Sequence, residues 1–490
     1  MLALALVALA LFAWNGSVPG LHADEAWTIL MAHAIAGGDR PGIGMSGYSG
    51  ILLPYLAAPV LAASQWSAAA LRGVAAVCNL AALGLGFAVL RRTENTPAAR
   101  AWAVLLLASS PTFIVQSRFA VEGNALTPLL SAAALWLLLT AANGQPPRVA
   151  RLALAGACFG LAGYNDATSL ALPVALAVVA VIFDRATWLR RRTVVPLAAG
   201  FLVGFAPRIA TMLVSAPALF FAPLTGRPGS RAADLLHLPW TFFRAVDGSL
   251  LYRQITGTLE VPVLPYALLA LAALVLLRYR AGRPLASRDA AIALLIALPA
   301  FEITLLGPAL GSHLLLLPAL LFPILLVRVA APLLAGPDAR AAPAILAATL
   351  VFNVGYLAVD YFDAFRASGG NLAEVRVSTR RVELSHDWVD TQLLYRQLVD
   401  RGIQDVICER FIGWPLAVHD IGHSRLRIFL LELEPPALRG RRAALVAYAA
   451  PTPREGFTLD VTYEEQIGAH GGPLPRDRSF DPHFAVFVSR

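Results

Sequence analysis

The strongest constraint on this chain is a series of apolar segments, each long enough to cross a bilayer as a helix. A spanning helix needs roughly 20 predominantly apolar residues, and by that criterion we count about eleven segments. They lie near residues 1–15, 68–90, 101–117, 124–142, 151–165, 167–183, 194–213, 262–278, 289–306, 312–330 and 341–359. Only 14% of the 490 residues are charged, against about 25% in a typical soluble domain. The sequence therefore predicts an α-helical integral membrane protein.

The arginines predict how the chain is oriented. They gather in the loops that follow alternate segments, for example at 91–92, 148–151, 190–192 and 278–288, and cytoplasmic loops collect basic residues. The loops near 16–67 and 214–261, and everything after about residue 360, then face outward. The first segment is short and lacks a basic flank, so it is either a cleaved signal peptide or a retained helix, and retention preserves the alternation. We predict a multi-pass protein of a cell membrane, the inner membrane in a bacterium.

Composition argues against two other classes of protein. The net charge of +8 comes from arginines scattered through short loops rather than gathered in one patch, so no nucleic-acid partner is predicted. The three cysteines, Cys78, Cys158 and Cys408, lie far apart, so neither a disulfide framework nor a cysteine zinc site is expected.

The last part of the chain reads as a small α/β domain. Leu393, Leu394 and Leu398 recur at helical spacing and Gly402 follows as a cap. Apolar runs that read as buried strands follow at 405–409, 426–433, 442–449 and 484–490. We therefore predict a membrane domain over 1–360 and an extracytoplasmic α/β domain over 361–490, which acts as a structural or acceptor-docking module.

Two adjacent acids, Asp24 and Glu25, follow the first apolar segment. In one interpretation Asp24 is the N-cap of an amphipathic helix that lies on the membrane surface and ends at Gly37. In the other, charged groups at the boundary of so apolar a protein mark a functional site, because desolvating them is costly. The local physics leaves both open.

The layout of this region resembles the glycosyltransferase C superfamily, in the branch that holds protein O-mannosyltransferases and lipid A aminoarabinose transferases. An apolar first segment, Asp24 and Glu25 heading a helix, the stretch GYSGILLPYLAAPVLA and Arg72 opening the next segment carry the resemblance. It continues in SSPTFIVQSRFAVEGNALTPLL and GSHLLLLPALLFP. The short motifs are individually weak, and their order along about 360 residues is what is typical of the family.

The resemblance implies a membrane enzyme that moves a sugar, with inversion, from a polyprenyl-phosphate donor to a glycan, lipid or protein acceptor on the outer face. It makes Asp24 the general base and Glu122 a second carboxylate of the cavity. Glu25, which points away from Asp24, is suited to orienting the acceptor, an arginine or a metal.

Cations near the outer boundary are candidates for binding the donor phosphate, namely Arg72, Arg118 and His313. Each has a structural alternative. Arg72 snorkels to the interface, Arg118 pairs with Glu122 across a helix turn, and His313 is an ordinary polar residue near a helix start.

Asn165 and Asp166 are expected to line the cavity, or else to form a turn in which Asp166 caps a helix. Asp24, Glu25 and Glu122 offer oxygen ligands for a divalent cation. Metal dependence stays open, and no other cofactor is predicted.

Two differences from the family's sequence pattern bear on which sugar and which acceptor are predicted. The aminoarabinose transferases carry a Glu-Lys-Pro element where this chain has GYSGILLPYL, and the chain has no lysine. The large inserted outer domain of eukaryotic protein mannosyltransferases is also missing, so the sugar and the acceptor stay open. The alternatives are a multi-span transporter or lipid flippase, for which we find no internal repeat, and a non-catalytic scaffold.

Overall fold

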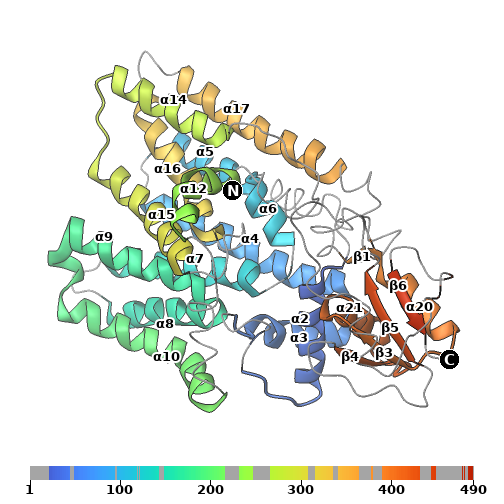
Figure 1. Cartoon of the computed structure of the whole chain (residues 1–490). Helices are drawn as coiled ribbons and strands as arrows, with labels where there is room; N and C mark the ends of the chain where they lie inside the picture. The colour runs from blue at the N-terminus through green and yellow to red at the C-terminus, as the bar shows by residue number, and fades with distance from the viewer. Residues whose placement is uncertain are drawn as a thin grey trace.

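A computed structural model describes residues 21–42, 44, 49–93, 96–118, 120, 122–142, 148–215, 231–246, 265–306, 315–334, 340–363, 377–378, 389–430, 443–448, 477, 479 and 484–488. A body of helices carries a small sheet domain at one end (Figure 1). The predicted first segment, 1–15, lies outside the described residues.

The helices of the body follow the predicted apolar segments closely. They are α2 (Ala23–Ala36), α3 (Leu52–Ala63), α4 (Ala68–Thr93), α5 (Pro97–Ala108), α6 (Pro111–Arg118), α7 (Glu122–Ala142), α8 (Val149–Asn165), η1 (Ala167–Leu170), α9 (Ala171–Trp188), α10 (Arg191–Ser215), α12 (Arg231–Val246), α14 (Tyr266–Arg280), α15 (Ser287–Leu306), α16 (Leu316–Ala330), η2 (Ala331–Leu334), α17 (Ala341–Gly355) and η3 (Tyr356–Asp363).

The prediction of a helical membrane protein is confirmed. Five helices among the described residues are long and apolar enough to cross a bilayer, within 68–93, 167–186, 191–214, 317–334 and 341–359. Shorter apolar helices cover 52–63, 97–108 and 125–141. The number of eleven segments stays a prediction.

One predicted segment is two helices. The span expected over 101–117 is broken between α5 and α6, where Ser109 caps the end of α5 and Pro111 begins α6. Proline lacks the backbone N–H that a continuing helix needs and is well suited to a first helical position. The hydropathy of the segment hid this break.

Helices α8 and α10 meet along a glycine seam formed by Gly156, Gly160, Gly200 and Gly204. A Cβ at any of the four would overlap a backbone carbonyl oxygen of the facing helix. Small residues allow two membrane helices to approach this closely, so that van der Waals contact between backbones holds them together.

A buried ion cluster joins the helices at the arginine-rich end of the helical body. The carboxylate of Asp289 on α15 pairs with Arg278 Nη2 of α14 at 2.9 Å and with Arg328 Nε of α16 at 3.1 Å. Arg328 also donates to the carbonyl of Thr93 on α4 at 3.3 Å. Two arginines that the sequence offered only as orientation signals therefore connect four helices.

The C-terminal domain contains the predicted strands as one four-stranded sheet. Its order is β4 (Arg427–Leu430), β3 (Asp405–Cys408), β5 (Ala443–Tyr448) and β6 (Phe484–Val488). The first three strands are parallel and β6 is antiparallel to β5. The pair β1 (Val377–Ser378) and β2 (Val389–Asp390) precedes it.

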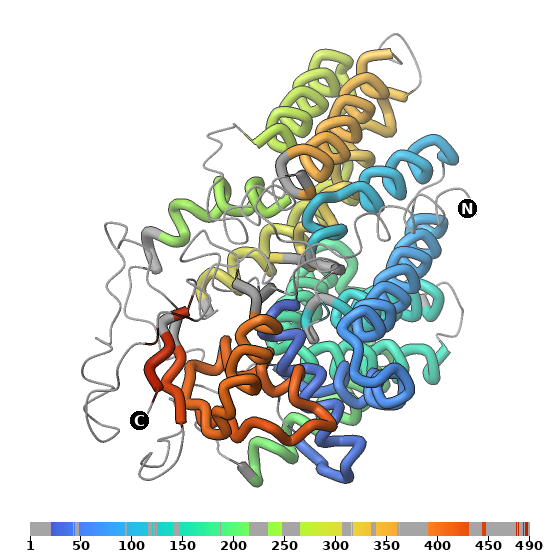
Figure 2. The backbone as a smooth tube through the Cα atoms, turned by 90° about the vertical axis from the view of Figure 1, so that its right-hand side faces the viewer, coloured from blue at the N-terminus to red at the C-terminus, as the bar shows by residue number. Residues whose placement is uncertain are grey.

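Two helices complete this domain. The predicted helix is α20 (Thr391–Asp400), and Gly402 follows it with φ of +67°, as expected of a left-handed cap. A second helix, α21 (Arg410–Asp420), was not predicted. It lies between the sheet and the helices α2 and α3, and the two views agree on this arrangement (Figures 1 and 2).

We expect Asp289→Ala to destabilise the protein by about 3–5 kcal/mol, because it leaves two guanidinium groups buried without their anion. The midpoint of thermal unfolding of the detergent-solubilised protein measures the effect. Asp39→Ala, which removes an exposed aspartate, is the matched control. An equal midpoint for the two variants would contradict the role given to the cluster.

Candidate functional site

The helix that carries the two acids begins two residues earlier than the N-cap prediction for Asp24 requires. His22 is the N-cap, and its Nδ1 accepts a hydrogen bond from the backbone N–H of Asp24 at 3.1 Å. The backbone N–H of His22 in turn donates to Glu25 Oε2 at 3.0 Å, which completes a capping box. Asp24 therefore lies inside the first turn of α2, and the cap prediction for it was wrong.

The surface position predicted for α2 was also wrong. The helix ends at Ala36 with Gly37 as its cap, as expected, but Ala26, Trp27 and Ile29 are buried. It packs against α3, α4 and α21. The C-terminal domain, whose position was not predictable from hydropathy, covers a face that the sequence assigned to the membrane surface.

Glu25 is completely buried and connects three parts of the fold. Its Oε1 accepts from Arg72 Nε at 2.8 Å and its Oε2 from Arg72 Nη2 at 2.6 Å, so the pair is bidentate. Oε1 also accepts from the backbone N–H of Ala120 at 3.1 Å. Glu25 thereby ties α2 to α4 and to the connection between α6 and α7.

The surroundings of Glu25 keep it ionised. Burial raises the pKa of this carboxyl, but the charge of Arg72 and the hydrogen bonds from Arg72, Ala120 and His22 together outweigh it, so the pKa lies below its ordinary value of 4.5. Of the partners predicted for Glu25, the structure brings an arginine to it. The role of Arg72 in binding a donor phosphate stays a prediction.

Asp24, the predicted base, has a different environment. Its side chain is 14% exposed, and its Oδ2 lies 3.7 Å from His22 Nδ1. Its backbone carbonyl accepts from the hydroxyl of Thr28 at 2.9 Å. The two adjacent acids thus differ, because Glu25 is enclosed by donors while Asp24 keeps some exposure to solvent.

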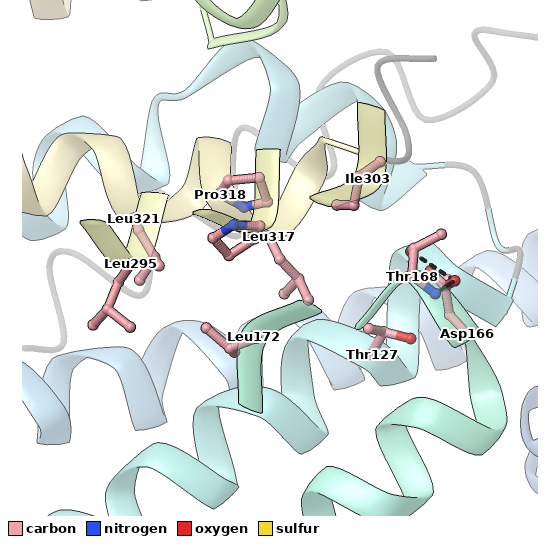
Figure 3. Close-up of a pocket in the computed structure, with 11 residues that line it drawn as sticks. Thr127, Asp166, Thr168, Leu172, Leu295, Ile303, Leu317, Pro318 and Leu321 are labelled. Carbon is pink, nitrogen blue, oxygen red and sulfur yellow. Dashed lines mark hydrogen bonds between the residues drawn. The ribbon is translucent and has the colours of Figure 1, made fainter. Parts of the chain in front are cut away.

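A pocket lies at the end of α8 and the start of α7. Gly123, Thr127, Asp166, Thr168 and Leu172 form one side, and α15 and α16 form the other with Leu295, Pro299, Ile303, Leu317, Pro318 and Leu321 (Figure 3). Asp166 is its acidic residue. Its Oδ1 accepts from the backbone N–H of Thr168 at 2.9 Å and from the Thr168 hydroxyl at 2.7 Å.

Asp166 caps η1, as one interpretation of the sequence expected, and it also lines this pocket. Its place in a substrate cavity stays a prediction. Burial raises the pKa of its carboxyl, although the hydrogen bonds from Thr168 and the charge of Arg208 act in the opposite direction. The start of α7 lies directly against it, because a Cβ on Gly123 would be 3.0 Å from Asp166 Oδ2.

Asn165, also predicted to line the cavity, lies behind its wall. It is fully buried, and its Nδ2 donates to Thr127 Oγ1 at 3.0 Å. Its carbonyl accepts from the backbone N–H of Gly50 at 2.8 Å. It therefore fixes the pocket residue Thr127 and the segment around Gly50 rather than forming part of the pocket surface.

Arg208 on α10 is a residue that the sequence analysis missed. It is only 2% exposed, and its Nη1 donates to the carbonyl of Ser49 at 3.1 Å. Its charge acts on Asp166. The available signal was an arginine inside the apolar segment 194–213, since an ionisable residue within a span is a functional-site candidate by default.

Three of the predicted site residues, Arg118, Glu122 and His313, have side chains that the structure does not describe. Arg118 is the last residue of α6 and Glu122 the first of α7, so the two do not share one turn of a single helix, and an ion pair between them stays a prediction.

An apolar groove continues from the pocket and shares Leu172, Leu317 and Leu321 with it. It has about 660 Å³ of empty space, open side included. Its other lining residues are Ala82, Leu83, Gly86, Val89, Leu107, Phe113, Pro128, Ser131, Ala132, Leu135, Leu320 and Ile324. The residues from α7 and α16 lie further along these helices than Gly123 and Leu317 do. The groove therefore extends deeper into the helical body than the polar pocket.

Metal binding gains no support from the described residues. Within them, no cluster of three or more histidine, cysteine or acidic side chains could hold a metal ion. Of the three acids considered as ligands, Glu25 already accepts four hydrogen bonds. The divalent cation stays an open prediction.

Comparison with known proteins supports the resemblance stated from the sequence. Residues 49–210 match the family model of dolichyl-phosphate-mannose-protein mannosyltransferases. The structure resembles ArnT from Cupriavidus metallidurans bound to undecaprenyl phosphate, with a TM-score of 0.58 at 15% identity over 99% of this chain and 97% of that one. The apo form of ArnT gives a TM-score of 0.57 at 14% identity over the same shares of the two chains.

A weaker likeness is to the oligosaccharyltransferase AglB from Archaeoglobus fulgidus in complex with an inhibitory peptide and a dolichol-phosphate. Its TM-score is 0.48 at 13% identity, over 88% of this chain and 63% of that one. No curated protein matches the chain. The family-model match and the ArnT-like fold confirm the resemblance to the glycosyltransferase C superfamily.

We expect Glu25→Gln to lower stability by about 3–5 kcal/mol, since it leaves the buried Arg72 without its counter-ion. The double variant Glu25→Gln/Arg72→Met should lose less than the sum of the single losses, because the two changes remove one shared interaction. Thermal unfolding of the four proteins measures both. Strictly additive losses would mean that the pair contributes nothing as a pair.

The same pair predicts a pH dependence. Because the folded-state pKa of Glu25 lies below its unfolded value near 4.5, its stabilising contribution is complete above that pH and is lost as the pH falls through the folded-state pKa. We expect the unfolding midpoint of Glu25→Gln to decline less than that of the wild type on acidification below about pH 4.5.

Proposed function

We propose that the protein is a membrane glycosyltransferase that moves a sugar from a polyprenyl-phosphate donor to an acceptor hydroxyl or phosphate on the outer face. The observation that carries this proposal is the pocket at Asp166, where Asp166, Thr127 and Thr168 provide polar groups, joined to an apolar groove that runs deeper into the body. A lipid-linked sugar has the same two parts, because its sugar phosphate is polar and its polyprenyl chain is a long hydrocarbon. Because that chain already lies in the hydrocarbon of the bilayer, the groove would hold it by van der Waals contact.

The likeness to other proteins supports the same substrate class. The ArnT structure was solved with undecaprenyl phosphate, and the matched family model describes enzymes that use dolichyl-phosphate-mannose. We infer that a polyprenyl phosphate is also the carrier here. The identities of the sugar and the acceptor are left open, because the family's distinguishing elements are missing from this chain.

The proposed reaction needs one proton acceptor. The acceptor oxygen attacks the anomeric carbon as the bond from that carbon to the phosphate oxygen breaks, and the bonding electrons leave with the phosphate. Inversion follows because attack and departure occur on opposite faces. We assign the acceptor's proton to the Asp24 carboxylate, since a base needs exposure to its substrate and Glu25 is enclosed by four donors.

We assign Asp166 a second role, in holding the acceptor or the sugar. Its carboxyl lines the pocket, and a carboxylate oxygen accepts hydrogen bonds from hydroxyl groups such as those of a sugar. Arg118, Glu122 and His313 keep the roles predicted from the family, phosphate binding for the two cations and a second carboxylate for Glu122.

Transfer of radiolabelled sugar from a panel of polyprenyl-phosphate sugars into a membrane extract tests the proposal. We expect Asp24→Asn to lower the rate by about 10²–10⁴-fold, as loss of a general base does, and Asp39→Asn, on the loop after α2, to leave it unchanged. Transfer that survives Asp24→Asn would move the base to Asp166 or Glu122. If the wild type transfers no sugar from any donor, the transporter or flippase interpretation replaces this one.

The groove makes a separate prediction. Ala132→Phe adds a ring to a residue that lines it, whereas Ala133→Phe adds the same ring to the next residue of α7, which does not. We expect Ala132→Phe to raise the KM for a long-chain donor at least several-fold while changing little for a donor with a short prenyl chain. An equal effect on both donors, or an equal effect of the two variants, would place the lipid elsewhere.

A further inference from the structure

Among the described elements of the C-terminal domain, helix α21 contacts the acid-bearing α2. Trp414, Val418 and Ile421 of α21 are partly buried against a cluster that includes Ala26 and Ile29 of α2. The same cluster contains residues of α3, α4 and α7. Trp414 and its neighbours therefore lie against the helix whose first turn holds Asp24 and Glu25.

Trp414 also belongs to a second cluster, with Trp27, Ile51 and Tyr164. Tyr164 directly precedes Asn165 and Asp166 in the chain, and its hydroxyl donates to the carbonyl of Gly42 at 3.0 Å. One indole therefore packs against a cluster that joins α2 to the end of α8. These are the two elements that carry the proposed base and the acid of the pocket.

The position of Trp414 is fixed within its own domain. Phe411 meets it edge to face, with ring centroids 6.0 Å apart, and the guanidinium of Arg410 lies 5.8 Å from the centre of its ring. The helix sits close to the sheet at Gly413, where a Cβ would overlap the side chain of Leu430 on β4. The tryptophan is thus carried by a helix that packs closely against the sheet.

The far end of α21 is held by Asp420. Its Oδ1 accepts from the hydroxyl of Tyr395 on α20 at 2.9 Å and from the backbone N–H of Arg425 at 3.0 Å. Its Oδ2 accepts from the backbone N–H of Leu426 at 3.1 Å. The link raises the pKa of Tyr395 to about 12, through burial and through its hydrogen bond to Asp420. Both ends of α21 are therefore attached to the α/β domain.

We propose that Trp414 is a positioning residue, through which the C-terminal domain holds α2 and the end of α8 in the arrangement that sugar transfer requires. The domain then acts as part of the scaffold of the site rather than as an acceptor-docking module. This inference rests on the proposed function for its kinetic consequences. Its structural content, that the indole restrains α2, stands independently.

The kinetic test compares Trp414→Ala with Trp414→Phe in the full-length protein. Catalytic groups misplaced by about 1 Å lose much of their effect, so we expect Trp414→Ala to lower kcat about tenfold or more with the KM values for donor and acceptor within about twofold. Trp414→Phe should restore most of the rate, because a ring still fills the contact. Leu393→Ala, at a side chain 37% exposed on α20, is the control in the same domain.

Two results of this kinetic test would contradict the proposed role of Trp414. A raised KM for the acceptor with an unchanged kcat would make the domain an acceptor-docking module and overturn the proposal. Equal losses in the alanine and phenylalanine variants, parallel to their thermal unfolding midpoints, would reduce Trp414 to a stabilising contact and also overturn it.

Amide hydrogen exchange of residues 23–36 provides a readout that needs no activity. We expect faster exchange there in Trp414→Ala than in the wild type and in Leu393→Ala, because the restraint on α2 is lost. Unchanged exchange would overturn the inference even if the rate falls. Faster exchange in a protein that transfers no sugar would uphold the restraint on α2 while the proposed function fails.

Discussion

The hydrogen-bonded pair between Glu25 and Arg72 is the interaction that organises the site. A carboxylate removed from water is costly unless its charge and its lone pairs are matched, and here one guanidinium and two backbone N–H groups match them. Because these donors come from α4, from the connection between α6 and α7 and from the cap of α2, the full set of hydrogen bonds forms only when all three are in place. It also separates two neighbouring acids, since Glu25 is committed to the fold and Asp24 remains beside it with partial exposure.

The site combines two environments, a pocket with polar groups and an apolar groove. The pocket around Asp166 has a carboxylate and two threonines on one side and apolar residues of α15 and α16 on the other, whereas Ser131 is the one polar side chain among the residues that line the groove. Leucines at three positions belong to both, so no polar barrier separates them. Few ligands need both environments at once, and an isoprenoid phosphate carrying a sugar is one of them.

Periodicity and hydropathy predicted the elements of the fold well, and the contacts between distant elements poorly. The ends of α4, α8 and α10 and the four strands of the C-terminal sheet follow from local apolar patterns. The break at Pro111 was visible as a residue but not as a change in hydropathy. Asp24 and Glu25 stood out as a pair, yet nothing local distinguished the buried acid from the exposed one, since that depends on Arg72, which is 47 residues away from Glu25. Trp414 was missed for the same reason, because its importance lies in what the fold brings beside it, whereas Arg208 carried a local signal as an arginine inside an apolar segment.

The glycine seam has a consequence for how this region is able to move. At the glycine seam the backbones of the two helices touch, and no flexible side chains lie between them. Helices α8 and α10 therefore move together as one rigid unit. Asp166 follows the end of α8, and Arg208 is carried by α10. The distance between the Asp166 carboxyl and the Arg208 guanidinium therefore stays the same when the helical body fluctuates. If the pocket opens or closes, the wall formed by α15 and α16 is the part that moves.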